Sequence, residues 1–215
     1  RVHRRLAGMS LAECIRRESG GKAPEEVESL CLDQAKCGDG LSSLAPFSNL
    51  MSLSIQDAGI SSLDTLPALE TLSTLKMSDN KIKSGLENLL RLPALEKLYL
   101  AGNQIGSLEA LQELEKIKSL AWLDLEGNPV TKVDGYSKSV FEMLPNLVVL
   151  DGKNRDGEEI EEAEDDDEDE EEDEEDDDDD DDERPANKAG ADDANGDDDE
   201  DEEEEEGEAA GGADE

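Results

Sequence analysis

The feature that most constrains how this chain folds is a pattern of leucines that recurs at an almost constant spacing. Three segments, at 72–82, 95–105 and 120–130, follow the pattern LxxLxLxxNxL, in which x is any residue and Ile, Val or Met sometimes replaces Leu. Looser copies lie at 27–35 and 50–60. Equivalent positions are 22 to 25 residues apart, so the same structural unit is expected to occur several times in succession.

A period of this length is typical of leucine-rich repeats. Within the LxL core of each unit, the two apolar side chains share one face of a short strand, because side chains alternate along a strand. One unit cannot cover its own leucines, whereas stacked units bury them together and pair their strands in parallel. We therefore predict an α/β fold, a leucine-rich repeat solenoid of about five repeats over residues 23–133 with parallel strands on its concave face.

One polar position of the repeat is predicted to be structural. Asn80, Asn103 and Asn128 follow the strand of their units, where the chain turns. A buried carboxamide both donates and accepts hydrogen bonds, so it can satisfy backbone groups that the turn leaves unpaired. Ala35 and Ala58 occupy this position in the first two units, and we expect those turns to be satisfied differently and to be looser.

Both ends of the repeat array carry a segment that can close it, which is needed because terminal repeats otherwise expose core leucines. Residues 9–22 predict an N-terminal capping helix, since Ser10 and Glu13 have the spacing of a capping box. Residues 134–155 predict a C-terminal cap, with a helix that ends before Pro145 and a last strand. The side chains expected to cover the core are Leu11, Cys14 and Ile15 in the first cap and Tyr136 and Phe141 in the second.

The charge of the chain is very unevenly distributed. Of 61 acidic and 20 basic residues, the first 155 positions hold 21 and 18, a net charge of −3. Residues 156–215 hold the other 40 acidic and 2 basic residues, a net charge of −38, and Ile160 is their single large apolar side chain. Such a segment cannot bury enough apolar surface to offset the entropy cost of ordering, so we predict a disordered acidic tail. Its densest part is the unbroken run Asp176, Asp177, Asp178, Asp179, Asp180, Asp181 and Asp182.

Composition argues against several classes of function. A tail of this charge repels phosphates, so direct nucleic-acid binding is not expected. No apolar run approaches the roughly 20 residues that span a bilayer and no signal peptide is recognisable, so we expect a soluble intracellular protein without membrane contact. Three cysteines without a CxxC pair, and His3 as the sole histidine, provide neither a zinc site nor a disulfide framework. We expect no metal, no cofactor and no enzymatic activity, because phosphate-binding loops and nucleophile–histidine pairs are also missing.

At these residues the chain resembles the acidic leucine-rich nuclear phosphoprotein family. The resemblance rests on the segments 66–89, 125–130 and 136–159, and on an acidic tail directly after the LPxLxxLD motif of the cap. It covers roughly residues 9–215. Residues 1–8 receive no structural assignment, and Met9, which follows them, is a candidate first residue.

The resemblance implies a non-enzymatic nuclear protein that binds histones, as a histone chaperone or by masking histone tails from acetyltransferases. In some members it also implies inhibition of a serine/threonine phosphatase or an influence on apoptosis. Two features depart from the family. Residues 156–215 contain no Ser or Thr to phosphorylate, and their basic residues are Arg184 and Lys188 alone rather than a nuclear-import cluster. Nuclear localisation, with shuttling to the cytoplasm as an option, is thus implied by the resemblance alone.

The outward-facing side chains of the predicted strands form a candidate binding surface on the concave face. Exposed aromatic residues beside charges are typical of interface anchors, which favours docking of a protein partner. The alternative is that the two aromatic rings only stack as cross-strand neighbours along the sheet. The residues predicted to gather there are Lys76, Lys97, Tyr99, Trp122, Asp124 and Glu126.

Three functions remain open at this point. The first is a histone-binding chaperone, a monomer whose tail captures basic segments of core histones or other basic proteins while the concave face docks a partner. The second is an adaptor similar to the leucine-rich spliceosomal subunit, in which the concave face holds a partner helix and the tail is incidental. The third is inhibition of a serine/threonine phosphatase. A tail that only increases solubility, or that binds calcium weakly, is the simpler alternative to histone capture.

Overall fold

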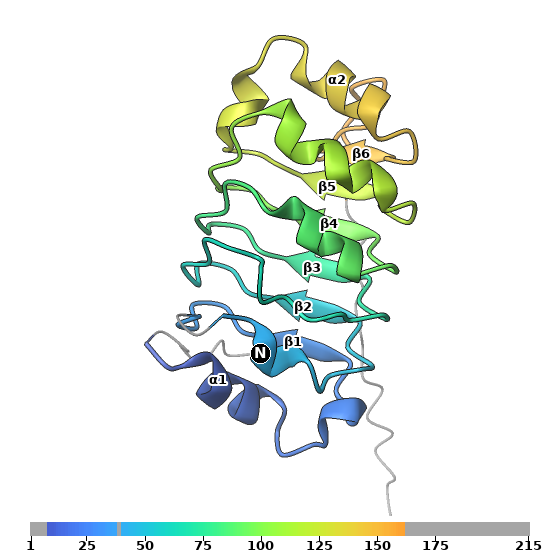
Figure 1. Cartoon of the computed structure of the whole chain (residues 1–215). Helices are drawn as coiled ribbons and strands as arrows, with labels where there is room; N and C mark the ends of the chain where they lie inside the picture. Colours follow the sequence, from blue (N-terminus) through green and yellow to red (C-terminus); the bar gives the residue numbers. More distant parts are fainter. Residues whose placement is uncertain (1–7, 38–39, 162–215) are drawn as a thin grey trace, which may run out of the picture. The chain divides into compact units, whose positions relative to one another are not determined.

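The computed structural model describes residues 8–37 and 40–161, which form a repeat array around one parallel sheet. Each repeat adds one short strand, and the strands pair in the order in which they occur in the chain (Figure 1). The prediction of a leucine-rich repeat solenoid with parallel strands is therefore confirmed. The six strands of this sheet are β1 (Ser29–Cys31), β2 (Ser52–Ser54), β3 (Thr74–Lys76), β4 (Lys97–Tyr99), β5 (Trp122–Asp124) and β6 (Val149–Leu150).

The register of the sheet explains the period of the leucines. The second Leu of each unit pairs with its equivalent in the next unit, so these side chains form one continuous row. Each is at most 2% exposed, whereas the flanking residues of β2 to β5 face the other way and are half-buried. The row consists of Leu30, Leu53, Leu75, Leu98, Leu123 and Leu150.

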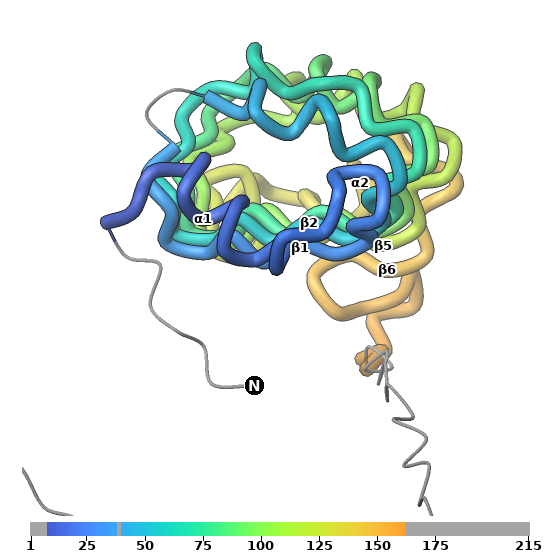
Figure 2. The backbone as a smooth tube through the Cα atoms, turned by 90° about the horizontal axis from the view of Figure 1, so that it is seen from below, coloured from blue at the N-terminus to red at the C-terminus, as the bar shows by residue number. Residues whose placement is uncertain are grey.

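The connecting segments return on the side of the array opposite the sheet, as a view along the stack shows (Figure 2). Several of them form short 3-10 helices, whereas the segment between β2 and β3 contains only turns. Leu86, Leu89 and Leu92 all face the core, because a 3-10 helix has three residues per turn and so aligns them. The 3-10 helices are η1 (Pro24–Glu26), η2 (Ser42–Leu44), η3 (Leu86–Arg91), η4 (Leu108–Lys116) and η5 (Pro129–Lys132).

The three asparagines form a ladder along the inside of the turns. The Asn103 carboxamide donates to the carbonyl oxygens of Met77 at 3.0 Å and Leu100 at 2.9 Å, and accepts from the N–H of Ile82 at 3.0 Å. Each shared carbonyl also accepts from a neighbouring asparagine, Met77 from Asn80 and Leu100 from Asn128. Carbonyls and carboxamides therefore alternate, and each asparagine connects two successive repeats.

The two alanine turns are satisfied in different ways. The N–H of Ala58 donates to Oδ1 of Asn80 at 3.1 Å, so the next asparagine in the ladder closes this turn. The N–H of Ala35 donates instead to the carbonyl of Leu32, and the adjacent N–H of Lys36 donates to the carbonyl of Met9. In the described part of the chain, backbone-to-backbone hydrogen bonds thus close the first turn.

A glycine is required in the turn that contains Asn103. Gly102 has a φ of +66°, and a Cβ at this position would lie 3.3 Å from the Cα of Asp79 and closer still to its carboxylate. We predict that Gly102→Ala lowers the free energy of unfolding by about 1–3 kcal/mol, because it adds both a strained φ and a close contact. Urea unfolding followed by circular dichroism measures this. Gly106→Ala is the matched control, since a Cβ there meets nothing within 4 Å, and an equal loss in both variants would contradict the argument.

The N-terminal cap is shorter than predicted. Helix α1 spans Leu11–Glu18 rather than the whole of residues 9–22. The capping box is present: Oγ of Ser10 accepts from the N–H of Glu13, whose carboxylate accepts from the N–H of Ser10. The helix ends at Glu18 because the two glycines that follow Ser19 both adopt positive φ. Leu11 and Cys14 are buried, and Ile15 packs against the core at its edge.

The C-terminal cap combines helix α2 (Tyr136–Met143) with strand β6. Tyr136 and Phe141 are 8% and 6% exposed, so both rings cover the end of the core. The guanidinium carbon of Arg155 lies 5.2 Å from the centre of the Phe141 ring, and the same group donates to the carbonyl of Pro145 at 2.7 Å. Arg155 therefore holds the loop after α2 against the helix.

The cap also continues beyond the predicted boundary at Arg155. The N–H of Asn154 donates to the carbonyl of Glu158, and the N–H of Ile160 donates to the carbonyl of Gly152. An isolated bridge pairs Lys153 with Glu159. The predicted ranges 134–155 and 156–215 are corrected accordingly, and the cap ends at Ile160. The sequence prediction ended the cap too early because the last turn of the cap is rich in carboxylates, as the tail is.

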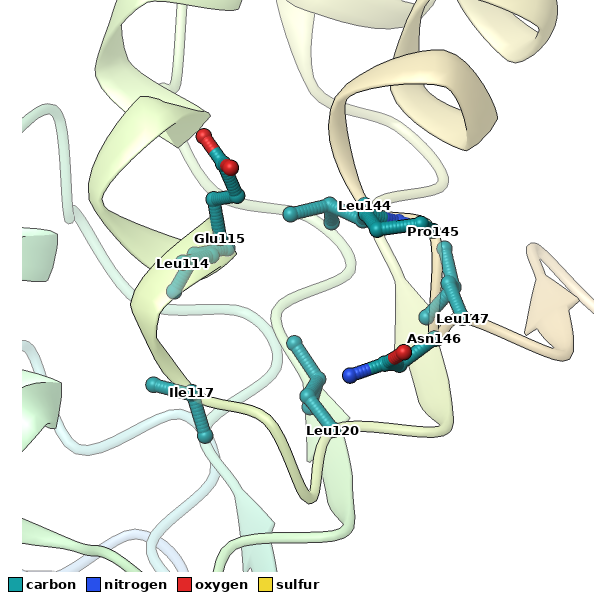
Figure 3. Close-up of a pocket in the computed structure, with 8 residues that line it drawn as sticks. All are labelled: Leu114, Glu115, Ile117, Leu120, Leu144, Pro145, Asn146 and Leu147. Atoms are coloured by element: carbon teal, nitrogen blue, oxygen red, sulfur yellow. The ribbon is translucent and has the colours of Figure 1, made fainter.

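A small cavity of about 10 Å³ lies where the cap meets the last repeat (Figure 3). Leu114 and Leu120 line it from the repeat, and Leu144 and Leu147 line it from the cap. Its volume is about that of one water molecule, so it is a packing defect rather than a ligand site. The predictions for residues 1–7, for the acidic tail beyond residue 161 and for its run Asp176–Asp182 lie outside the described residues.

Candidate protein-docking face

The concave face of the sheet brings most of the predicted site residues together on three adjacent strands. β3, β4 and β5 each present their first and last residues on this face, and these side chains are half-buried. Parallel pairing aligns equivalent positions, so the side chains form rows across the strands. One row places Lys97 beside Trp122, and the next row contains Lys76, Tyr99 and Asp124.

Two aromatic rings form the centre of this surface. The ring centres of Tyr99 and Trp122 are 6.5 Å apart with an angle of 35° between the planes. The ammonium nitrogen of Lys76 lies 5.2 Å from the centre of the Tyr99 ring, within range of a cation–π contact. The rings therefore contact each other as cross-strand neighbours, yet both remain partly exposed. Such a rigid amphipathic pair gives a partner a large contact area at low entropy cost.

Carboxylates gather beside the aromatic pair, toward the C-terminal cap. Burial raises the pKa of Asp124 above its ordinary value, and the nearby Glu126 carboxylate raises it further, although the Glu126 N–H, which donates to Asp124, opposes this. Glu126 is exposed and lies two residues beyond the end of β5. Asp151 follows β6 and accepts from the N–H of Leu125 at 2.7 Å. The concave face thus changes from cationic at β3 to anionic beyond β5.

Asp151 makes the stability of the fold depend on pH. Burial raises its pKa, the hydrogen bonds from Leu125 and Tyr136 lower it, and the Asp124 and Glu126 carboxylates raise it. Its folded-state pKa therefore exceeds the unfolded value, so the folded protein binds the proton more tightly. This contribution to stability is present at low pH and is lost as pH rises through the folded-state pKa.

We predict that Asp151→Asn becomes progressively more stable relative to the unchanged protein as pH rises from about 4 to 7. An asparagine tolerates the φ of +51° at this position and keeps an acceptor for the Leu125 N–H. Thermal unfolding of both proteins across this range measures the difference, in which the shared contribution of the other acids cancels. A difference that is constant with pH, or that has the opposite sign, would contradict the prediction.

The N-terminal half of the concave face is polar and largely self-satisfied. The Asp33 carboxylate accepts from Oγ of Ser54 at 2.7 Å and from the N–H of Gln56 at 2.8 Å. The thiol of Cys31 donates to the same carboxylate, and burial raises the pKa of that thiol, which disfavours the reactive thiolate. The two aromatic rings and the lysines Lys76 and Lys97 therefore lie outside this half, on β3 to β5.

Metal-binding clusters and membrane-spanning helices are absent from the described residues. Within residues 8–37 and 40–161, no three His, Cys, Asp or Glu side chains are placed to hold a metal ion. No helix in the same ranges is long and apolar enough to cross a membrane. Two residues that shape this face, Asp33 and Asp151, were not singled out from the sequence. The LPxLxxLD motif contained Asp151 and was the one available signal, because Asp33 acts through contacts with Ser54 and Gln56 of the next repeat.

Comparison with known proteins supports this description. A family model described as leucine-rich repeat matches residues 40–174. Two curated relatives, from Drosophila pseudoobscura pseudoobscura and Drosophila melanogaster, are both named acidic leucine-rich nuclear phosphoprotein 32 family member A. They are 39% and 37% identical to this chain over 147 residues, which cover 68% of this chain and 56% of each relative. The chain thus spans a little more than half the length of the curated relatives it matches.

A solved structure also matches part of this chain. In the crystal structure of the Drosophila melanogaster SNF/U2A′ complex, one chain matches with a TM-score of 0.46 and 27% identity. The match covers 54% of this chain and 64% of that chain.

Proposed function

This chain belongs to the leucine-rich repeat family and, within it, groups with the acidic leucine-rich nuclear phosphoproteins, and from this premise we propose that it is a non-enzymatic nuclear protein that binds histones. In this proposal the acidic tail captures basic segments of core histones, and the concave face docks a part of the partner. The protein then acts as a histone chaperone, or it masks histone tails from acetyltransferases. Shuttling to the cytoplasm and a monomeric state belong to the same proposal.

The observation that carries the proposal is the separation of charge along the chain. Residues 156–215 have a net charge of −38, whereas the first 155 residues have a net charge of −3. A polyanion of this density retains condensed counterions and releases them when a polycation binds, which favours association. The same charge competes with nucleic acid for basic proteins. An adaptor that docks its partner on the concave face makes no use of this charge.

Calorimetric titration of purified core-histone dimers into the full-length chain tests the proposal. We expect stoichiometric binding at physiological salt and markedly weaker binding when the salt concentration is doubled, because counterion release becomes less favourable. Absence of binding at physiological salt, or an affinity that does not change with salt, would overturn capture by the tail. Albumin, an acidic protein, is the control titrant and should produce no heat of binding.

An adaptor function is the second candidate, and the aromatic pair Tyr99 and Trp122 is the observation that favours it. An adaptor needs its concave face but not its tail, so removing the tail separates the two functions. Inhibition of a serine/threonine phosphatase, with a role in apoptosis, is a third proposal that follows from the family resemblance alone. A phosphatase assay with the full-length chain tests it directly.

A further inference from the structure

The order of groups across the concave face points to a more specific ligand. From β3 to the cap, two lysines on β3 and β4, two aromatic rings on β4 and β5, and carboxylates at the end of β5 follow one another. We propose that this surface binds an arginine side chain of a basic partner segment, with the guanidinium on the Trp122 ring and paired with the carboxylates of Asp124 and Glu126. The inference rests on the proposed function and specifies which side chain of the partner the concave face recognises.

The spacing of the three residues fits this ligand. Trp122 and Asp124 are the first and last residues of β5 and share its concave side, so their Cα atoms are about 6.6 Å apart. A guanidinium within about 6 Å of a ring centre can also reach a carboxylate at about 2.8 Å, because its nitrogens point outward in the plane of the group. Glu126, in the turn two residues further along, is exposed, and its carboxylate lies near enough to act on Asp124 as a second acceptor.

The electrostatics of the site favour an incoming cation. Asp124 is half-buried, and the neighbouring charge that acts on it is the like charge of Glu126. No described cation is among the groups that shift its pKa. Lys97 pairs with Trp122 in register on the β4 side, so the open side for a further cation is the cap side, where the paired residue is the buried and uncharged Val149. A guanidinium would relieve the repulsion between the two carboxylates.

The surface already shows the kind of contact that the proposal requires. Lys76 rests on the Tyr99 ring on the β3 side of the aromatic pair, so the sheet supports a cation over an aromatic ring in this row. Arginine suits the β5 side better than lysine, because its planar group can stack on an indole and pair with a carboxylate at the same time. A lysine ammonium is a point charge that satisfies one of these contacts well.

The experiment follows the fluorescence of Trp122, the only tryptophan of the chain, in the full-length protein. The probe is the peptide acetyl-Ala-Arg-Ala-Arg-Ala-amide, with its lysine counterpart for comparison. Residues 156–215 contain no aromatic side chain, so peptide bound only to the tail leaves this signal unchanged. We expect a saturable change with the arginine peptide and an affinity about fivefold lower for the lysine peptide.

Asp124→Asn with Glu126→Gln should weaken the fluorescence-detected affinity for the arginine peptide by about fivefold or more. The control, Glu70→Gln with Glu87→Gln, removes the same charge at two exposed positions away from the concave face and should have little effect. Thermal unfolding checks that both variants fold.

An unchanged Trp122 signal, equal affinities for the two peptides or equal losses in both double variants would overturn the inference. These outcomes leave the histone titration unaffected. Conversely, failure of the histone titration with a positive Trp122 signal would overturn the proposed function and retain an arginine site.

Discussion

Removing the tail after Glu161 is expected to lower the affinity for core-histone dimers by about 100-fold or more at physiological salt. The truncation removes residues 162–215, which carry almost all of the excess negative charge. It leaves the hydrogen bonds from the N–H of Asn154 to Glu158 and from the N–H of Ile160 to Gly152 in place, so the cap should remain closed. A cut at Arg155, where the sequence alone placed the boundary, would damage that cap and confuse loss of charge with loss of structure.

Isothermal titration calorimetry of the full-length and truncated chains measures this difference. Circular dichroism and thermal unfolding of the truncated chain provide the control for folding. The slope of log affinity against log salt should also become much shallower, because fewer counterions are released on binding. If both chains bind alike, the tail is not the capturing element, and histone binding would have to be assigned to the repeats.

Replacing Asn103 with alanine is expected to lower the free energy of unfolding by about 3 kcal/mol. The buried N–H of Ile82 loses its acceptor, and three carboxamide hydrogen bonds, to Met77, Leu100 and Ala101, disappear. The carbonyls of Met77 and Leu100 keep one donor each, from Asn80 and Asn128, which limits the loss.

Denaturant unfolding of the full-length chain tests the effect of Asn103→Ala. Gln104→Ala is the matched control, because Gln104 is the next residue in the same turn and its side chain is exposed. We expect a change of less than about 0.5 kcal/mol for the control. Asn103→Asp is a second comparison, because it keeps the acceptor for Ile82 but loses the donors. It should lower the free energy of unfolding by at least as much as the control does. If Asn103→Ala and Gln104→Ala behaved alike, the ladder would have no energetic role.

The parts of the fold that were predictable from the sequence are those set by a local period. The LxL core fixed which side chains of β3, β4 and β5 face outward, because alternation along a strand needs no information from elsewhere. The capping box at Ser10 and Glu13 is equally local. These patterns were sufficient to place Tyr99 and Trp122 on the same face of adjacent strands, where they are diagonal neighbours because the register pairs Tyr99 with Asp124.

The parts that were not predictable depend on contacts across repeats or on composition that misleads. The Asp33 carboxylate accepts a hydrogen bond from the N–H of Gln56, and the Asp151 carboxylate accepts one from the N–H of Leu125. Each of these bonds joins neighbouring repeats, and no period in the sequence indicates it. The end of the cap was hidden because Glu158 and Glu159 have the composition of the tail. Charge arithmetic identifies a segment that lacks apolar residues, but it does not detect backbone hydrogen bonds such as that of Ile160.

The ladder of asparagines also makes the two ends of the array unequal in their resistance to force. The first asparagine of the ladder, Asn80, accepts a hydrogen bond from the turn at Ala58. Among the described residues, no asparagine of the ladder bonds to the turn at Ala35. Pulling on the two ends should therefore detach β1 and α1 first, while the repeats from β3 to the cap resist as a block. Hydrogen exchange should follow the same order, with amides of β1 exchanging before those of β4. The end of the molecule that carries the docking surface is then the end that yields last.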